Sequence, residues 1–353
     1  MLAQAELKRR NTRWRGNVIP VLLLCGLSVG SAQDSSQQRT PTLRTQSNVV
    51  LAPTLVKDKN GKPVFGLHAR DFIIEDDGKQ QQASIDEPEP EEAVSLVVAI
   101  QIGRSAPSEF QRMKGLSSML DQIVGRPQVA TAIVTFDSQV NLVQDFTFDS
   151  SQSEAQLRKS ISGRLRDMEL SGDTSSAAIY DAVRYSVNLL EKQPEDSRRV
   201  LLLISETRDH GSRAVKLDDA ITAVNESNTI VYSLAFSPAA SSALDTMRGK
   251  EPAQPGGIGQ LLILARQAMR KNAAKSVTSM TGGEYEVFTS RKSFENFMMQ
   301  FANHLHNRYL LRFEPKNPHP GLHEVRVRLR EHGNLTVLAR RSYWVEDPDK
   351  PVQ

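Results

Sequence analysis

One loop of the sequence contains side chains that could act as acid, base and nucleophile. Asp209 and His210 are adjacent, and Ser205 and Ser212 lie within a few residues of them. Hydrolysis by such a triad needs a hydroxyl, an imidazole and a carboxylate in a fixed spatial order, which neighbours in one short loop rarely provide. A solvated loop is therefore the expected structure, and a hydrolase is the less favoured function.

Other common catalytic and binding patterns are weak. The seven histidines include no His-Glu-x-x-His pair, so a zinc site is not expected. Alternating arginines suggest one basic strand face, but no aromatic residues interleave with them, so we expect a solvated face and no nucleic-acid partner. The histidines are His68, His210, His304, His306, His319, His323 and His332, and the arginines are Arg326, Arg328 and Arg330, with Arg340 and Arg341 on the next strand.

The stretch Ser95–Ser105 is the clearest candidate for the edge of a site. Its apolar run ends in the polar segment Gln101–Ser105, and a helix is expected from about Pro107. A short apolar run that ends in a glycine turn before a helix is typical of a strand buried on both faces of a parallel sheet. Ligands collect at the carboxyl ends of such strands, so Gln101–Ser105 lies where a binding site is expected.

Strand and helix patterns alternate over residues 94–308, which predicts a doubly wound α/β domain with helices on both faces of the sheet. The segment that follows the second strand is expected to be an antiparallel edge strand. The expected strands are 96–102, 130–136, 140–146, 200–205, 229–236 and 284–288, and the expected helices are 107–123, 153–165, 176–190, 217–225, 261–280 and 294–306.

Two β-rich segments flank this domain. Residues 48–86 contain the turn dipeptides Asn60-Gly61 and Asp77-Gly78, and residues 309–346 contain the period-two strand 325–329. We expect the two segments to pair as one sandwich-like module into which the α/β domain is inserted. Residues 347–353 are a short tail.

The N-terminus predicts export. Residues 1–32 have a basic lead, an apolar core and small residues before Gln33, which is the pattern of a cleaved signal peptide, and residues 33–47 read as a disordered spacer. Lipidation at Cys25 is not expected because Leu24, and not a small residue, precedes it. Of 44 basic and 41 acidic residues, the signal holds five and one, so the mature chain has 39 and 40 and a net charge of −1.

The order of elements over residues 94–308 resembles a von Willebrand factor type A (VWA) domain. The flanking motifs at residues 58–67, 71–79, 281–285 and 307–315 are similar to those of a group of exported acidobacterial VWA proteins, and the resemblance covers residues 49–345. It implies a Rossmann-like fold in which three loops at the top of the sheet hold a divalent metal ion.

The metal motif of the family is only partly present. Its pattern Asp-x-Ser-x-Ser falls on Gln101, Gly103 and Ser105; its threonine falls on Thr174 or Ser176, and the aspartate of the fourth strand falls on Glu206. Mg²⁺ prefers hard oxygen ligands that include carboxylates, and Arg104 and Arg208 bring positive charge to the same rim. We therefore expect a degenerate metal-ion-dependent adhesion site without metal. If an ion is bound, Mg²⁺ or Mn²⁺ on Ser105, Thr174 and Glu206 is the alternative.

The resemblance implies an exported, non-enzymatic protein-binding module of the adhesion or scaffold type. A protein or peptide partner is expected at the top of the sheet, where Arg104 or Arg208 could meet a partner carboxylate directly. A metal-dependent adhesion module, a hydrolase and a structural envelope component are the alternatives. Once the signal is cleaved, the protein is expected not to span a membrane and to be periplasmic, at the cell surface or secreted. The expected rim comprises Gln101, Gly103, Arg104, Ser105, Thr174, Ser176, Glu206, Arg208 and Asp209.

Overall fold

The computed structural model describes residues 49–86, 93–113, 115, 116, 119, 129–149, 155, 156, 159, 160, 162, 163, 166, 176–236, 258–316, 318–331 and 334–347. The expected signal peptide and spacer, Thr174, most of the helix expected at 153–165 and nearly all of the tail lie outside these residues. Within the described part of the chain, no helix combines the length and the apolar character needed to cross a membrane.

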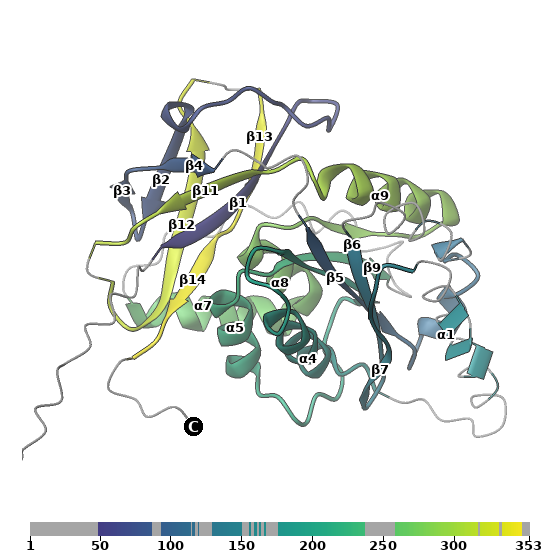
Figure 1. Cartoon of the computed structure of the whole chain (residues 1–353). Coiled ribbons are helices and arrows are strands. Elements are labelled where there is room, and N and C mark those ends of the chain that lie inside the picture. The colour runs from purple at the N-terminus through teal and green to yellow at the C-terminus, as the bar shows by residue number, and fades with distance from the viewer. Residues whose placement is uncertain are drawn as a thin grey trace, which may run out of the picture. The chain divides into compact units, whose positions relative to one another are not determined.

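A six-stranded mixed sheet forms the centre of the α/β domain, as the alternation of elements predicted (Figure 1). Five of its strands are parallel, and the sixth is antiparallel at one edge, as expected. The strands, in spatial order, are β10 (Tyr285–Val287), β9 (Ile230–Phe236), β8 (Arg198–Glu206), β5 (Val94–Gln101), β6 (Val129–Phe136) and β7 (Val140–Thr147).

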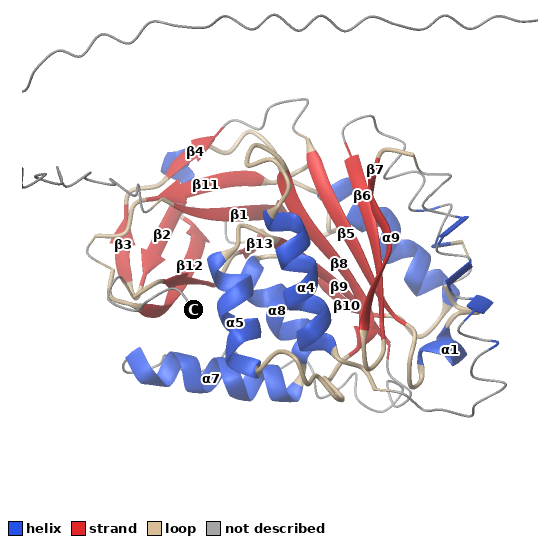
Figure 2. Ribbon diagram, turned by 60° about the horizontal axis from the view of Figure 1, so that its bottom comes forward, coloured by secondary structure: helices blue, strands red, loops and turns tan. Residues whose placement is uncertain are grey.

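Helices cover both faces of this sheet (Figure 2). One face packs against α4 (Ile179–Glu191), α5 (Leu217–Glu226) and α8 (Ala273–Thr281), and the other against α9 (Arg291–His304) and the short α1 (Ala106–Glu109). Alternate residues of β5 therefore enter two different cores, and all eight of them are buried. This double burial explains why residues 96–100 of the strand form a continuous apolar run.

The helix expected over 261–280 is in fact two helices. α7 (Ile258–Lys271) ends one residue before Asn272, and α8 begins one residue after it. The Asn272 side chain accepts a hydrogen bond of 2.8 Å from the Lys275 N–H, which caps the N-terminus of α8. The apolar spacing continues across Asn272 and therefore did not reveal the break. An asparagine side chain caps a helix only where the backbone leaves the helical path, so the residue type alone does not mark a boundary.

The two β-rich segments pair with each other, as expected. They form two four-stranded sheets in which β1 lies between β11 and β13, and β12 lies between β14 and β2. Figure 1 shows the N-terminal and C-terminal strands side by side in this module. The strands are β1 (Val50–Lys57), β2 (Phe72–Asp76), β3 (Lys79–Gln81), β4 (Ser84–Asp86), β11 (Tyr309–Phe313), β12 (Gly321–Leu329), β13 (Thr336–Ala339) and β14 (Ser342–Val345).

Arg340, between β13 and β14, does not lie on a solvated strand face, so that expectation is wrong. The residue is 3% exposed, and its guanidinium donates to the carbonyl oxygens of Val224, Asn225 and Ser227 at the C-terminal end of α5. Burial lowers the pKa of Arg340 to about 10, so the group stays charged at neutral pH. The free carbonyls and the negative end of the helix dipole compensate this buried charge.

Candidate functional site

The carboxyl ends of β5 and β8 meet because these two strands are neighbours in the sheet. Gln101, the last residue of β5, is fully buried, and its amide oxygen accepts the N–H of Glu206 at 2.8 Å. Its amide nitrogen donates to the Gly103 carbonyl at 3.1 Å and to a Glu206 carboxylate oxygen at 3.3 Å. Gln101 therefore connects the two strand ends, and its amide oxygen is already engaged by the Glu206 backbone.

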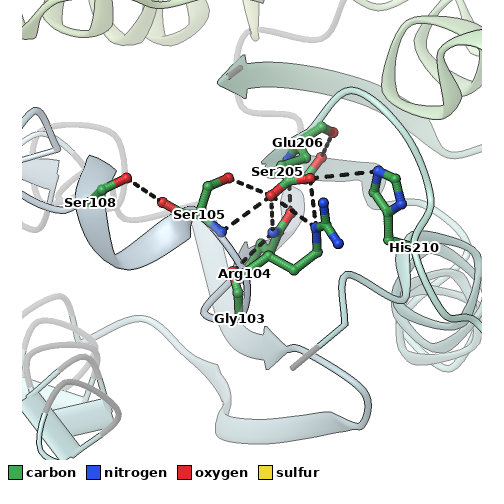
Figure 3. Close-up of polar contacts among 8 residues, drawn as sticks. Gly103, Arg104, Ser105, Ser108, Ser205, Glu206 and His210 are labelled. Atoms are coloured by element: carbon green, nitrogen blue, oxygen red, sulfur yellow. Dashed lines mark hydrogen bonds and ion pairs between the residues drawn. The ribbon is translucent and has the colours of Figure 1, made fainter. Parts of the chain in front are cut away.

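Arg104 has a left-handed backbone with a φ of 52°, which is uncommon for a residue other than glycine. Its Nε donates to both oxygens of Glu206, at 3.1 Å and 3.3 Å (Figure 3). The Arg104 side chain is 40% exposed and the Glu206 side chain 8%. The ion pair therefore has one buried member and one member at the surface.

Glu206 is the centre of the cluster. Besides Arg104 and Gln101, it accepts hydrogen bonds from the Ser105 hydroxyl and, at 3.3 Å, from the Ser105 N–H. The Nε2 atom of His210 lies 3.8 Å from the other carboxylate oxygen (Figure 3). Burial by itself raises the pKa of Glu206, but the Ser105 hydrogen bonds and the Arg104 charge outweigh it and hold the pKa below its ordinary value.

These residues do not fit a divalent metal ion. Mg²⁺ requires a nearly octahedral shell of hard oxygens, usually with one or two carboxylates. Here the Gln101 oxygen is used by the Glu206 backbone, and the Ser105 hydroxyl and Arg104 guanidinium both donate to the Glu206 carboxylate. The guanidinium thus supplies the positive charge that this carboxylate needs.

A second pair of loops meets beside this cluster. Ala177 and His210 form a two-hydrogen-bond bridge, with N···O distances of 2.7 Å and 2.8 Å. Gly211 permits the close approach, because a Cβ atom there would lie 2.5 Å from the Cβ of Ser176. Ser176 therefore lies against Gly211 in the loop after β8, while Thr174 is outside the described residues.

Asp209 is engaged at the N-terminus of α4. One of its oxygens accepts from the Tyr180 N–H at 3.2 Å and from the Ser212 hydroxyl at 2.5 Å. The Ser212 oxygen also accepts the N–H groups of Tyr180 and Asp181. Asp209 and Ser212 thus accept hydrogen bonds from backbone N–H groups that have no partner within the helix. The negative charge of Asp209 also interacts favourably with the positive end of the helix dipole.

Asp181 is a residue whose role sequence reasoning missed. Its carboxylate accepts the backbone N–H groups of Arg213, Ala214 and Val215, with the closest contact, 2.8 Å, to Val215. It therefore fixes the loop that follows β8 against α4. The only available signal was an acidic residue in the first turn of an expected helix, which is common without such a role.

Arg208 contacts the C-terminal end of α7. The side chain is exposed, and its Nε donates to the Lys271 carbonyl at 3.1 Å, at the C-terminus of α7. The structure therefore brings together Gln101, Gly103, Arg104, Ser105 and Glu206, and places Arg208 and Asp209 in separate contacts at the same edge of the sheet.

The geometry gives no support to a serine–histidine pair in this loop. The Ser205 hydroxyl is buried and donates to the Glu206 carbonyl at 2.8 Å, and the Ser212 hydroxyl donates to Asp209. Across the part of the chain that the structure describes, no hydrogen bond joins His210 to either serine.

Residues 96–256 match the family model described as the von Willebrand factor type A domain. No curated protein matches the chain. Solved structures with a similar arrangement include the conserved hypothetical protein BatB from Bacteroides thetaiotaomicron, which is 16% identical, with 60% of this chain and 98% of that chain covered and a TM-score of 0.40.

Two further similar structures come from a bacterium and a mussel. The PilB minor pilin from Streptococcus sanguinis is 10% identical, with 63% of each chain covered and a TM-score of 0.40. Proximal thread matrix protein 1 from the mussel byssus, solved with a zinc-occupied MIDAS motif, is 11% identical, with 67% of this chain and 50% of that chain covered and a TM-score of 0.40.

Proposed function

Because the chain carries a von Willebrand factor type A domain at residues 96–256, we propose that it is an exported, non-enzymatic interaction module. Its partner is a protein or peptide that presents a carboxylate to the top of the sheet. The partner binds without a divalent ion, and Arg104 provides the charge that a metal ion provides in relatives with the complete motif.

The observation that carries this proposal is the placement of the Arg104 guanidinium. Its Nε is held by Glu206, and among the described residues no hydrogen bond or ion pair involves its two terminal amino groups. The Arg104 side chain is 40% exposed, so it can be reached from solvent. A guanidinium whose position is fixed on one side can bind a carboxylate with two parallel hydrogen bonds on the other.

The fixed orientation also supports binding on energetic grounds. An arginine normally loses side-chain entropy when it is immobilised by a partner. Glu206 and the left-handed backbone already restrict Arg104, so part of that loss occurs on folding. His210 lies beside the pair and Ser176 lies against the adjacent Gly211, and both are only partly buried, so they can extend the contact surface.

The test is a comparison of partner capture by matched variants. Residues 33–353 are used as bait against the cell envelope of the source organism, with and without chelator, and captured proteins are quantified by mass spectrometry. Arg104→Ala and Arg104→Lys should lose the partner, since alanine removes the charge and lysine removes the paired donors. Capture should be unaffected by chelator.

Arg326→Ala is the matched control, because Arg326 has the same 40% side-chain exposure and a comparable ion pair, with Glu324 at 3.3 Å, but lies in the β module. It should retain the partner. If both Arg104 variants capture as well as the wild type, the proposed binding site is wrong.

The metal-dependent alternative is separated by calorimetry with Mg²⁺, Mn²⁺ and Ca²⁺. We expect no binding at the top of the sheet. Clear binding that Glu206→Ala abolishes would replace the proposal with a metal-dependent adhesion module. Export is tested by N-terminal sequencing of the mature protein, which should begin at Gln33, whereas a retained leader would contradict it.

A further inference from the structure

A cluster of metal-ligating side chains lies in the β module, remote in sequence from the loops at the top of the sheet. Asp77 is in the turn between β2 and β3, His319 precedes β12, and His323 is in β12. One potential ligand atom from each side chain lies within 4.8 Å of the other two. The turn and the strand are 246 residues apart in sequence but adjacent in space, because β2 pairs with β12.

The hydrogen bonds of His323 leave one of its nitrogens facing a carboxylate. Its Nε2 lies 2.6 Å from the His319 carbonyl oxygen, which can only accept, so the proton is on Nε2. Its Nδ1 lies 2.8 Å from Oδ2 of Asp77 and 3.9 Å from Oδ1 of Asp76. A bare nitrogen lone pair cannot face these oxygens favourably, so a cation, either a proton or a metal ion, must lie at this nitrogen.

His319 brings a second imidazole to the same carboxylate. Its Nε2 lies 3.6 Å from Oδ2 of Asp77, and its ring stacks on that of His323 with centroids 4.1 Å apart. One nitrogen of each imidazole therefore faces the same carboxylate oxygen, which places the three potential ligands around one position.

The surroundings of the cluster also match a metal site. The second oxygen of Asp77 accepts the Glu324 N–H at 2.9 Å, which orients the carboxylate, and the His323 bond to a backbone carbonyl orients that imidazole. Such outer contacts are typical of histidine and carboxylate ligands. The His323 side chain is 3% exposed, but those of His319 and Asp77 are 33% and 38% exposed, so an ion and its waters can enter from solvent.

We infer that Asp77, His319 and His323 bind a divalent transition-metal ion. Two imidazoles and one carboxylate with a position open to water suit Zn²⁺ best among the common ions. The bound ion ties the β2–β3 turn to the start of β12, so it stabilises the β module. His319 and His323 have the spacing His-x-x-x-His. The sequence search for His-Glu-x-x-His pairs missed them, because the residue after His319 is not glutamate.

The experiment is calorimetric titration of untagged, metal-free residues 33–353 with Zn²⁺, together with thermal unfolding. The wild type should bind one ion per chain and unfold at a higher temperature in its presence, since an ion that binds only the folded state stabilises that state. Co²⁺ should give the visible absorption of a site with nitrogen ligands.

Two variants and one control decide whether the cluster is responsible. His319→Gln and Asp77→Asn should weaken Zn²⁺ binding by more than about tenfold, the lower limit typical even for loss of an outer contact. Asparagine tolerates the left-handed φ of 46° at position 77, so this variant keeps the turn. His68→Gln should bind as the wild type does, because His68 lies 3.7 Å from Asp71 in the same module, and no third ligand joins them among the residues that the structure describes.

The inference is overturned if the wild type binds no Zn²⁺, or if neither ligand variant weakens the binding. Binding that only Glu206→Ala removes would also overturn it, because that result would assign the ion to the top of the sheet. The outcome is independent of the partner-capture experiment, since the two sites share no residue.

Discussion

The Nε atom of Arg104 lies 3.1 Å from one carboxylate oxygen of Glu206 and 3.3 Å from the other, at the carboxyl ends of two neighbouring strands. Relatives with the complete motif place a divalent cation at this edge of the sheet. Here an internal cation of fixed position balances the buried carboxylate, and this relationship leads to the first two predictions.

Arg104→Gly should raise the pKa of Glu206 and destabilise the protein at neutral pH. Glycine accepts the positive φ of position 104, so the variant removes the guanidinium without disturbing the loop. Because the folded-state pKa of Glu206 is depressed, the stabilisation is present above its ordinary value of 4.5 and is lost as the pH falls through the folded-state value.

Urea unfolding as a function of pH measures this effect. At neutral pH the free energy of unfolding of Arg104→Gly should be lower than that of the wild type by about 1–3 kcal/mol, which is the cost of leaving a buried polar group without its partner. The difference between variant and wild type should disappear in acid, where Glu206 is protonated in both. A difference that stays constant down to pH 3 would contradict the assignment.

The triple variant Gln101→Asp, Gly103→Ser, Arg104→Ala should gain a Mg²⁺ site. It restores the carboxylate and hydroxyl of the family motif and removes the competing cation. Calorimetry should detect Mg²⁺ binding and thermal unfolding should shift upward with Mg²⁺ only in the variant. Equal binding by the wild type would show that Arg104 does not take the place of the ion.

Glu284→Gln should cost about 3 kcal/mol at pH 7, from the difference between an ordinary pKa of 4.5 and a folded-state pKa of about 2. Burial raises this pKa, but hydrogen bonds from His304 and Lys57, both at 2.7 Å, and the charge of Arg308 lower it further. The stabilisation is full above pH 4.5 and is lost as the pH falls toward 2.

Chemical unfolding across this pH range gives the measurement. Glu286→Gln is the control, because Glu286 lies two residues further on, in β10, and burial raises its pKa, so neutralising this group should cost little. If both variants lose the same stability at pH 7, the network around Glu284 is not the cause.

Gly211→Ala should destabilise the protein more than Gly78→Ala. Both glycines have a positive φ, 112° and 77°, which costs about 1–3 kcal/mol for a residue with a side chain. Only at Gly211 would the new Cβ collide with Ser176, 2.5 Å away, whereas nothing lies within 4 Å at Gly78. Thermal or chemical unfolding measures the stability that each variant loses, and the additional loss in Gly211→Ala is the contribution of the close contact between the two loops. Equal losses in the two variants would show that this contact contributes nothing.

The sequence predicted most of the fold because burial leaves a local pattern. Strands covered on both faces appear as continuous apolar runs, and strands of the β module alternate with period two. The break at Asn272 escaped, since apolar spacing continues across it. The burial of Arg340 was not predicted either, because no local sequence pattern indicates that its guanidinium donates to the carbonyl oxygens at the end of α5.

The sequence alone determined the α/β alternation, the paired flanking segments and the positions of Gln101 and Glu206 at strand ends. Only the tertiary structure decided which polar side chains meet: Arg104 with Glu206 and not Arg208, and Asp77 with His319 and His323. The physical reason is range. Apolar periodicity acts over a few residues, whereas these contacts join residues 102 and 246 apart in sequence, and depend on strand pairing and on backbone angles such as the left-handed φ of Arg104.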